Sequence, residues 1–287
     1  MNVTEVPSGK VIYVTCKDHT VSGESFDLLF DGEREMLITL PKPSLEKLPE
    51  YYQSEKYISH TDSRISFTDK IYQTVKRYML RKKLNWINNQ FPEKGKLLDI
   101  GAGTGDFLLE AKNDGWEVKG IEPELKAREL ALKKGIEIKE NSQDFGSEKF
   151  DVITMWHVLE HVPDLEKQVF ELDKLLKKNG LLVIAVPNFK SYDAKYYKEF
   201  WAAYDVPRHL WHFSENSFKP IFKETKFQQI EKKGLFFDAF YVSLLSEKYM
   251  TGNSNFLKAF YIGMKSNLMA RKTAQHSSHV YFFRKTA

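Results

Sequence analysis

Two short segments of the 287-residue chain contain histidines, whose side chains can transfer protons in catalysis. His157 and His161 stand four residues apart after an apolar run, and Arg208 and His209 are adjacent further along the chain. An imidazole titrates near neutral pH, so it can accept a proton from a hydroxyl or an amine. We therefore predict His161 and His209 as the leading general bases. His157 is a further catalytic candidate, and Arg208 is a candidate clamp for an anionic substrate.

Structural roles are also open to these residues. A histidine can hydrogen-bond a loop carbonyl or contact a cofactor, and Arg208 can fix its loop through an ion pair. The segment from His157 to His161 also spells H-x-x-E-H, a zinc-peptidase signature. We disfavour that function because the segment follows an apolar strand in a nucleotide-binding pattern, and no strong glutamate ligand follows downstream. The sequence therefore predicts no metal ligands.

A glycine-rich turn from Gly101 to Gly105 follows the apolar strand that contains Asp99. Such a turn lets backbone N–H groups approach a ligand closely. Asp106 stands where the dinucleotide fingerprint G-x-G-x-x-G needs its third glycine, and an acidic residue there would repel the pyrophosphate of NAD. Glu122, at the end of the second strand, can accept hydrogen bonds from both ribose hydroxyls. These features favour S-adenosylmethionine, which contains an adenosine but no phosphate.

Strand and helix patterns alternate on either side of this turn, and this alternation must position the candidate residues. The predicted strands are Lys96–Ile100, Glu117–Ile121, Ile136–Lys139, Phe150–Met155 and Leu181–Val186. The predicted helices are Ile71–Gln90, Gly105–Asn113, Glu124–Lys134 and Leu165–Lys178, the last closed by a helix stop at Asn179-Gly180. We predict an α/β fold with a Rossmann-like, doubly wound, mostly parallel seven-stranded sheet. Because ligands bind at the carboxyl ends of such strands, the turn and the histidines should meet there.

The two ends of the chain depart from this alternation. We interpret residues 1–70, with short β-like runs at Val11–Val14 and Met36–Leu40, as a small N-terminal cap in which Tyr52, Tyr57 and His60 form a lid. The main domain covers 71–287, with an insertion at about 188–215 and a helical excursion at about 236–275. Its tail should contain helices at Ser214–Thr225, Phe240–Tyr249 and Asn255–Ala270, and strands at Gln228–Lys232 and His279–Arg284. We expect the last strand, His279–Arg284, to pair antiparallel at one edge of the sheet.

The composition is that of a globular protein, with 42% hydrophobic and 29% charged residues. The net charge of +4 is too small to indicate nucleic-acid binding. No run of eighteen apolar residues indicates a membrane span, and the first ten residues lack the apolar region of a secretory signal. Cys16 is the single cysteine, which excludes disulfides within the chain and favours a cytoplasmic protein.

Three motifs together carry a family resemblance: L-L-D-I-G-A-G-T-G-D-F, G-I-E-P and F-D-V-I-T-M-W-H-V-L-E-H-V. Over about residues 75–287 the chain resembles the class I S-adenosylmethionine-dependent methyltransferases. The resemblance implies contacts to the methionine end from Asp99, Gly101, Gly103 and Gly105, with Ala102 and Asp106 beside them. It implies ribose contacts from Glu122, with Pro123 next to it, and adenine contacts from the loop Asn141, Ser142, Gln143 and Asp144. Trp156 and His157 would form the floor under the cofactor, and we add Tyr57 and His60 from the lid.

A further segment, Asp205 to Phe213, contains P-R-H-L-W-H-F. It resembles a bacterial subgroup found among surface-polysaccharide and small-metabolite methyltransferases. Members of that subgroup commonly begin with a cysteine-rich, zinc-ribbon-like segment. Residues 16–22 resemble part of it, but the other cysteines are absent, so we predict no metal there.

The leading functional hypothesis is therefore methyl transfer from S-adenosyl-L-methionine to an oxygen or nitrogen of a small molecule or a sugar-linked intermediate, with S-adenosyl-L-homocysteine as product. One alternative is a non-catalytic S-adenosylmethionine-binding protein whose lid and tail bind a partner. A less favoured alternative is an RNA or protein methyltransferase, because the positive charge is weak. The sequence leaves the acceptor and the oligomeric state open.

Overall fold

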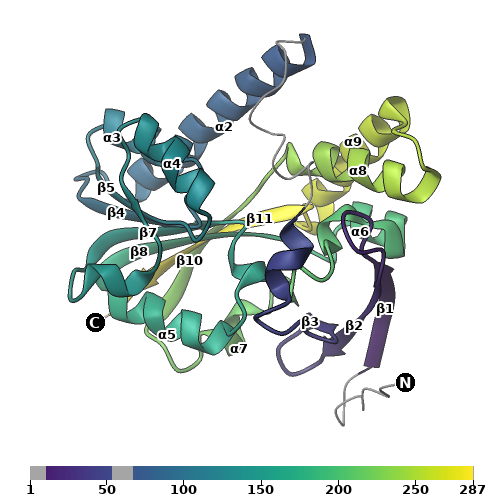
Figure 1. Ribbon diagram of the computed structural model, residues 1–287, viewed down its shortest axis with the longest axis horizontal. Coiled ribbons are helices and arrows are strands. Elements are labelled where there is room, and N and C mark those ends of the chain that lie inside the picture. The colour runs from purple at the N-terminus through teal and green to yellow at the C-terminus, as the bar shows by residue number, and fades with distance from the viewer. Residues whose placement is uncertain (1–10, 54–66, 287) are drawn as a thin grey trace.

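The computed structural model describes residues 11–53 and 67–286 of the chain, with side chains from residue 73 onward in the second range. Seven strands form one sheet in the order β10-β11-β8-β7-β4-β5-β6 (Figure 1). They are β4 (Lys96–Ile100), β5 (Glu117–Ile121), β6 (Ile138–Lys139), β7 (Phe150–Trp156), β8 (Leu176–Pro187), β10 (Phe227–Gly234) and β11 (Ser278–Lys285). Strands β4 to β8 are parallel, and β11 runs antiparallel to both of its neighbours. The predicted Rossmann-like fold is confirmed.

Strand β8 shows why this sheet is covered on both faces. Leu182 and Ile184 pack into one core, whereas Leu181 and Val183, which point the other way, pack into another. The first core also contains apolar residues of α5 (Leu165–Leu175) and of α7 (Phe218–Ile221). The second contains residues of α2 (Phe67–Gln90), α3 (Asp106–Asn113) and α4 (Leu125–Lys133). The second half of β8 is apolar at every position because helices cover both faces of the sheet.

Several predicted bounds differ from the structure, among them that of β8, which begins at Leu176 and not at Leu181. Helix α5 ends at Leu175, not at Lys178, because Leu176 is fully buried and pairs with Phe150 of β7. The helix predicted at Ser214–Thr225 is limited to the short α7, since Ser214 donates its backbone N–H to Oγ of Ser217 instead of joining a helix. The closing strand β11 lies second from the edge, because β10 pairs with its outer side and forms the edge itself.

The N-terminal strands form a separate antiparallel sheet in the order β1-β2-β3-β9. Its strands are β1 (Val11–Lys17), β2 (Ser25–Asp31), β3 (Met36–Leu40) and β9 (Trp211–His212), the last from the insertion that follows β8. A third core joins Phe26 and Leu28 of this sheet to Trp201 of the insertion and to Val242 and Ile262 of the helical excursion. The N-terminal segment therefore shares its core with the later parts of the chain. We call these parts together the cap lobe.

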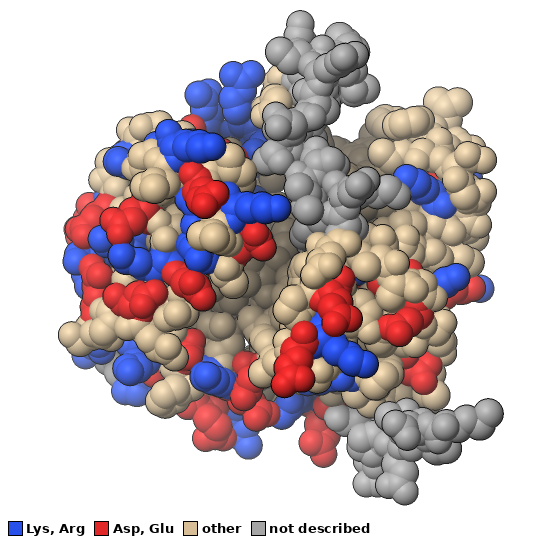
Figure 2. Space-filling model, viewed as in Figure 1, with Lys and Arg blue, Asp and Glu red and all other residues tan. Residues whose placement is uncertain are grey.

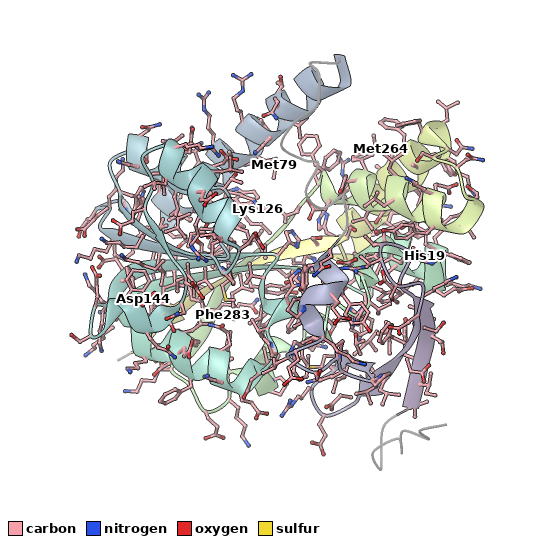
Figure 3. The ribbon with its side chains drawn as sticks, in the orientation of Figure 1. His19, Met79, Lys126, Asp144, Met264 and Phe283 are labelled. Atoms are coloured by element: carbon pink, nitrogen blue, oxygen red, sulfur yellow. The ribbon has the colours of Figure 1, made fainter. Side chains whose placement is uncertain are left out.

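The cap lobe also contains α6 (Tyr192–Tyr197), α8 (Asp238–Thr251) and α9 (Phe256–Thr273), which lie on the right in Figure 1. A hollow separates this lobe from the parallel strands, and Figure 2 shows it near the centre of the molecule. Figure 3 labels Met79 of α2 and Met264 of α9, which come from the two different lobes. Among the described residues, no helix combines the length and apolar character that a membrane crossing requires.

Candidate active site

The glycine turn begins where β4 ends, at the carboxyl edge of the sheet. Gly101, Gly103 and Gly105 have φ values of 71°, 52° and 74°, a region that side chains with a Cβ disfavour. A Cβ on Gly101 would lie 2.3 Å from Cγ2 of Val158, whereas nothing stands within 4 Å of the same position on Gly103. The first glycine therefore permits close packing against the segment after β7, and the second leaves space for a ligand.

Strand β5 holds the turn in place through its last residues. The backbone N–H groups of Gly101 and Ala102 both donate to the carbonyl of Ile121, over 2.8 and 2.9 Å. The N–H of Gly103 donates to Oε2 of Glu122 over 2.9 Å, and the N–H of Glu124 donates to Oε1 over 3.0 Å. The Glu122 carboxylate is thereby fixed beside the glycine turn, in the position expected for a ribose acceptor.

Asp99 lies under the turn and is only 3% exposed. Its carboxylate accepts a hydrogen bond from Oγ1 of Thr154 over 2.6 Å. Burial raises the pKa of Asp99 to about 7, and neither Thr154 nor the nearby Lys83 offsets that effect fully. A buried carboxylate of this kind gains from a cationic neighbour, which the methionine end and the sulfonium of S-adenosylmethionine would supply.

Asp106, the predicted contact at the start of α3, is held by two lysines. Its oxygens lie 2.5 Å from Nζ of Lys76 and 2.6 Å from Nζ of Lys134. Burial raises the pKa of Asp106, but these two lysines outweigh burial and the pKa is lowered overall. This carboxylate therefore ties α3 to α2 and to the residue after α4.

The predicted adenine loop forms the single turn η3 (Ser142–Phe145) after β6. Asn141 caps it in a capping box with Asp144, and Oγ of Ser142 contacts Glu171 of α5 over 3.2 Å. Figure 3 labels Asp144 in the half of the molecule that contains the parallel strands. The carbonyl of Pro123 accepts a hydrogen bond from Arg128 over 2.6 Å. Gln143 is exposed in the same turn.

Trp156 ends β7 and packs edge-to-face on Phe107 of α3. Nζ of Lys83 lies 4.3 Å from the centre of its indole ring. The indole N–H is buried and has no hydrogen-bond partner within the described parts of the chain. Buried donors are normally paired, so this N–H is a free group in the region predicted for the cofactor.

His157 follows Trp156 with a φ of 58° and is held between two carboxylates. Its Nε2 lies 3.1 Å from Oδ2 of Asp238 at the start of α8, and its Nδ1 lies 3.3 Å from Oε1 of Glu160. Burial lowers the pKa of His157, but Asp238 and Glu160 outweigh burial and raise it to about 9. A protonated ring with both nitrogens engaged is suited to holding Glu160 in place rather than to accepting a proton.

His161 and His209 meet across the boundary between the lobes. Their rings lie edge-to-face with centroids 4.5 Å apart. The insertion is brought there by a backbone bond from Leu210 N–H to the carbonyl of Glu160, and by a bond from Thr39 Oγ1 to the carbonyl of His209. His161 thus ends η4 (Leu159–His161), which follows β7, and His209 lies in the insertion after β8. The two leading base candidates are brought together as the sequence analysis expected.

The two rings are oriented by backbone carbonyls. Nδ1 of His209 lies 2.9 Å from the carbonyl of Ala203, and Nδ1 of His161 lies 3.2 Å from the carbonyl of Arg208. Nδ1 of His161 also lies 3.1 Å from the hydroxyl of Tyr52. Burial and, to a smaller extent, the neighbouring His209 lower the pKa of His161 to about 4. Because a carbonyl only accepts, each Nδ1 carries the proton and each Nε2 is left as an acceptor.

The four-residue spacing of His157 and His161 predicts both on one face of a short helix, but η4 is a single turn that begins after His157. This prediction is wrong, because His157 lies outside the turn with a positive φ and its Nε2 faces Asp238. The zinc-peptidase geometry of two histidines on one helix is therefore absent from this segment.

Arg208 is 1% exposed, and its donors are occupied. Its guanidinium lies 2.7 Å from Oδ1 of Asp205 and 2.9 Å from Oδ1 of Asp18, and it donates to the carbonyl of Tyr51 over 2.9 Å. Burial lowers the pKa of Arg208, but Asp205 and Asp18 raise it overall. These contacts are those of a residue that fixes the insertion to the N-terminal segment, the second of the two roles open to it.

Of the three residues predicted to form a lid, Tyr57 and His60 fall outside the described residues, and Tyr52 contacts His161. Two other residues of the site were not predicted as site residues. Glu160 enters the sequence analysis only through the H-x-x-E-H motif, and Asp238 does not enter it at all. Asp238 comes from the start of a helix far along the chain, so no local pattern connects it with His157.

The comparisons with known proteins agree with this architecture. A family described as "Methyltransferase domain" matches residues 72–232, more than half of the chain. The chain belongs to this methyltransferase family. The methyltransferase family expected from the motifs is thereby confirmed.

Curated relatives match this methyltransferase over part of their length. The ubiquinone biosynthesis O-methyltransferase of Pelagibacter ubique (strain HTCC1062) is 39% identical over 107 residues, which are 34% of this chain and 45% of that protein. The enzyme of the same name from Coxiella burnetii (strain RSA 493 / Nine Mile phase I) is 30% identical over 122 residues, 38% of this chain and 52% of that protein. The chain therefore spans about half the length of these curated relatives.

Solved structures share the fold of this methyltransferase. Magnesium protoporphyrin IX methyltransferase from Synechocystis PCC 6803, with SAH bound, has a TM-score of 0.57 at 13% identity, covering 85% of this chain and 100% of that one. The plantazolicin methyltransferase BpumL in complex with SAH has a TM-score of 0.53 at 13% identity, covering 84% and 94%. At this identity the likeness is one of fold.

Proposed function

We propose that this chain transfers a methyl group from S-adenosylmethionine to an oxygen or nitrogen of a small molecule or a sugar-linked intermediate. The observation that carries the proposal is the placement of His161 and His209 after β7 and β8, at the carboxyl edge where the glycine turn lies. Ligands of open α/β sheets bind at this edge. The packing of Val158 against Gly101 links the two parts of the site directly.

The residues around the turn fit the cofactor on their own chemistry. Asp99 is a buried carboxylate with a raised pKa, Glu122 is fixed at the end of β5, and the indole N–H of Trp156 is buried without a partner. We assign Asp99 to the cationic end of the cofactor and Glu122 to the ribose. When bound, the cofactor supplies a methyl group on a positively charged sulfur.

The chain's own contribution is to position the acceptor and to remove its proton. His161 and His209 each have Nε2 available because each Nδ1 faces a backbone carbonyl. An imidazole nitrogen can take the acceptor's proton as the new bond to carbon forms. Holding the reacting atoms in line contributes about 7–11 kcal/mol in well-oriented reactions. The names of the curated relatives favour an oxygen acceptor within this class.

A methyl-transfer assay on the full chain tests the proposal. The chain is incubated with S-adenosylmethionine and with separate pools of phenols, small amines and sugar derivatives, and products are identified by the added methyl mass. We expect methylation within one pool, and a large loss of turnover in His209→Ala with SAH affinity unchanged. His276→Ala provides the matched control. Binding of SAH without methylation of any pool would instead support the non-catalytic alternative and overturn the proposed transfer.

A further inference from the structure

We infer that Glu160, His161 and His209 form a binding site for a divalent transition-metal ion. Each of these side chains offers one ligand atom, and the three atoms lie within 4.8 Å of one another. Zinc binds histidine nitrogen and carboxylate oxygen at about 2.0–2.2 Å, so one ion between the three atoms needs only small side-chain rotations. The site itself is argued from the described residues, and its role in catalysis rests on the proposed methyl transfer.

Glu160 provides an observation that the histidines alone would not. Its side chain is fully buried, and beyond the ion pair with the His157 ring neither carboxylate oxygen has a hydrogen-bond partner among the described residues. The nearest positive group is the ring of His157, 3.3 Å from Oε1. Buried carboxylates are normally satisfied by several hydrogen bonds or by a metal ion. Its second oxygen is therefore left for a ligand between the lobes.

The surrounding contacts are those that orient metal ligands. Metal-binding histidines usually donate their other ring N–H to a carbonyl or a carboxylate. His161 and His209 do so through Nδ1, to the carbonyls of Arg208 and Ala203. Glu160 is itself held by His157, whose far nitrogen is held by Asp238. All three proposed ligands thus have partners that fix their direction.

The ligand types select the class of ion. Two imidazoles and one carboxylate suit zinc, iron, cobalt or nickel, whereas magnesium and calcium prefer oxygen ligands. Three protein ligands leave at least one coordination position open, as in catalytic rather than structural zinc sites. We assign that position to an oxygen of the methyl acceptor, whose proton would leave to water more easily once the oxygen binds the ion. With the ion bound, His161 and His209 are its ligands, and this water takes the place of the imidazole as the proton acceptor. This inference departs from the expectation of no metal site.

Cobalt binding tests the site without using activity. The full chain is treated with a chelator, the chelator is removed, and Co²⁺ is added while its visible absorption is followed. We expect one Co²⁺ per chain with the spectrum of a nitrogen- and oxygen-bound ion, and displacement by Zn²⁺. A chain that binds no Co²⁺ in this titration overturns the inference.

Variants locate the ion. Glu160→Gln and His161→Ala should each lower Co²⁺ affinity by at least the ~10–100-fold that loss of a supporting residue costs. His157→Ala, which removes such a support, should fall within that range. The control His276→Ala should bind Co²⁺ as the wild type does. Unchanged affinity in Glu160→Gln and His161→Ala would place the ion elsewhere and contradict the assignment.

SAH binding, measured on the same samples by calorimetry, separates this inference from the proposed function. Variants that bind SAH with wild-type affinity are folded, so a loss of Co²⁺ in them is due to the missing ligand. If the wild type binds SAH but no Co²⁺, the metal inference fails and the methyltransferase proposal stands. If it binds Co²⁺ but not SAH, the proposed function fails and the metal site stands.

Discussion

The rings of His161 and His209 lie edge-to-face, with centroids 4.5 Å apart, although they belong to different lobes. One follows a strand of the parallel sheet, and the other belongs to the insertion that adds β9 to the N-terminal sheet. The contact therefore depends on the docking of the cap lobe. Any change that loosens the docking should separate the two imidazoles.

Loss of Arg208 should loosen that docking. Its buried guanidinium joins Asp205 of the insertion to Asp18 of the N-terminal segment. We expect Arg208→Ala to lower the free energy of unfolding by about 3–5 kcal/mol, because two carboxylates lose their buried partner. Urea denaturation measures the loss. Arg34→Ala, which breaks an exposed pair with Glu166, should cost less than about 1 kcal/mol.

The same variant separates the two roles open to Arg208. If this residue clamps an anionic substrate and does not fix the loop, Arg208→Ala would keep the wild-type unfolding free energy and raise KM alone. That result would contradict the structural role.

The first and second glycines of the turn should respond differently to a methyl group. Gly101→Ala combines a positive φ with a Cβ 2.3 Å from Val158, whereas Gly103→Ala has a positive φ but open space. We expect about 1–2 kcal/mol of backbone strain in both, and a further ~1–3 kcal/mol from overpacking in Gly101→Ala alone. Thermal unfolding of the two variants measures the difference. Equal destabilisation would show that the packing against Val158 carries no weight.

The affinity for the cofactor should depend on pH through Asp99. Its pKa is about 7 without ligand because of burial. A cation favours the ionised carboxylate, so affinity should rise as the pH passes through about 7 and then level off. Calorimetry of S-adenosylmethionine binding to the wild type and to Asp99→Asn at several pH values measures this, because titration of the cofactor itself is common to both. Parallel pH profiles for the two proteins would rule out the assignment of Asp99.

The stability of the ligand-free chain should show the opposite trend. The folded pKa of about 7 lies above the ordinary 3.8, so the folded state binds the proton more tightly. The stabilisation is complete below about pH 4 and is lost as the pH rises to 7. The difference corresponds to about 4 kcal/mol at 1.36 kcal/mol for each unit of pH. In urea denaturation, Asp99→Asn should therefore gain stability relative to the wild type between pH 5 and pH 8, and a constant difference would argue against it.

Local patterns were sufficient for the sheet and the cofactor turn. Strands β4 and β5 have the predicted bounds, because each is a short segment between turn signals. Asp99, Gly101 and Glu122 could be chosen because a turn between a strand and a helix sets their spacing. Helix α5 was extended too far, because the pairing of Leu176 with β7 is a long-range contact.

The acid–base part of the site depends on such long-range contacts. Asp238 meets His157, and Tyr52 meets His161, through the packing of the cap lobe on the sheet. No spacing along the sequence predicts either contact, because the two partners lie far apart in the chain. For Arg208 the sequence could give only the residue type, since its burial between Asp18 and Asp205 follows from the docking.

A crystal structure of the full chain with SAH tests the central claim most directly. We predict SAH at the carboxyl edge of β4 and β5, with its ribose on Glu122 and its sulfur facing the space beside His161 and His209. SAH bound elsewhere than at the glycine turn, or with its sulfur facing away from both imidazoles, would contradict the proposed site.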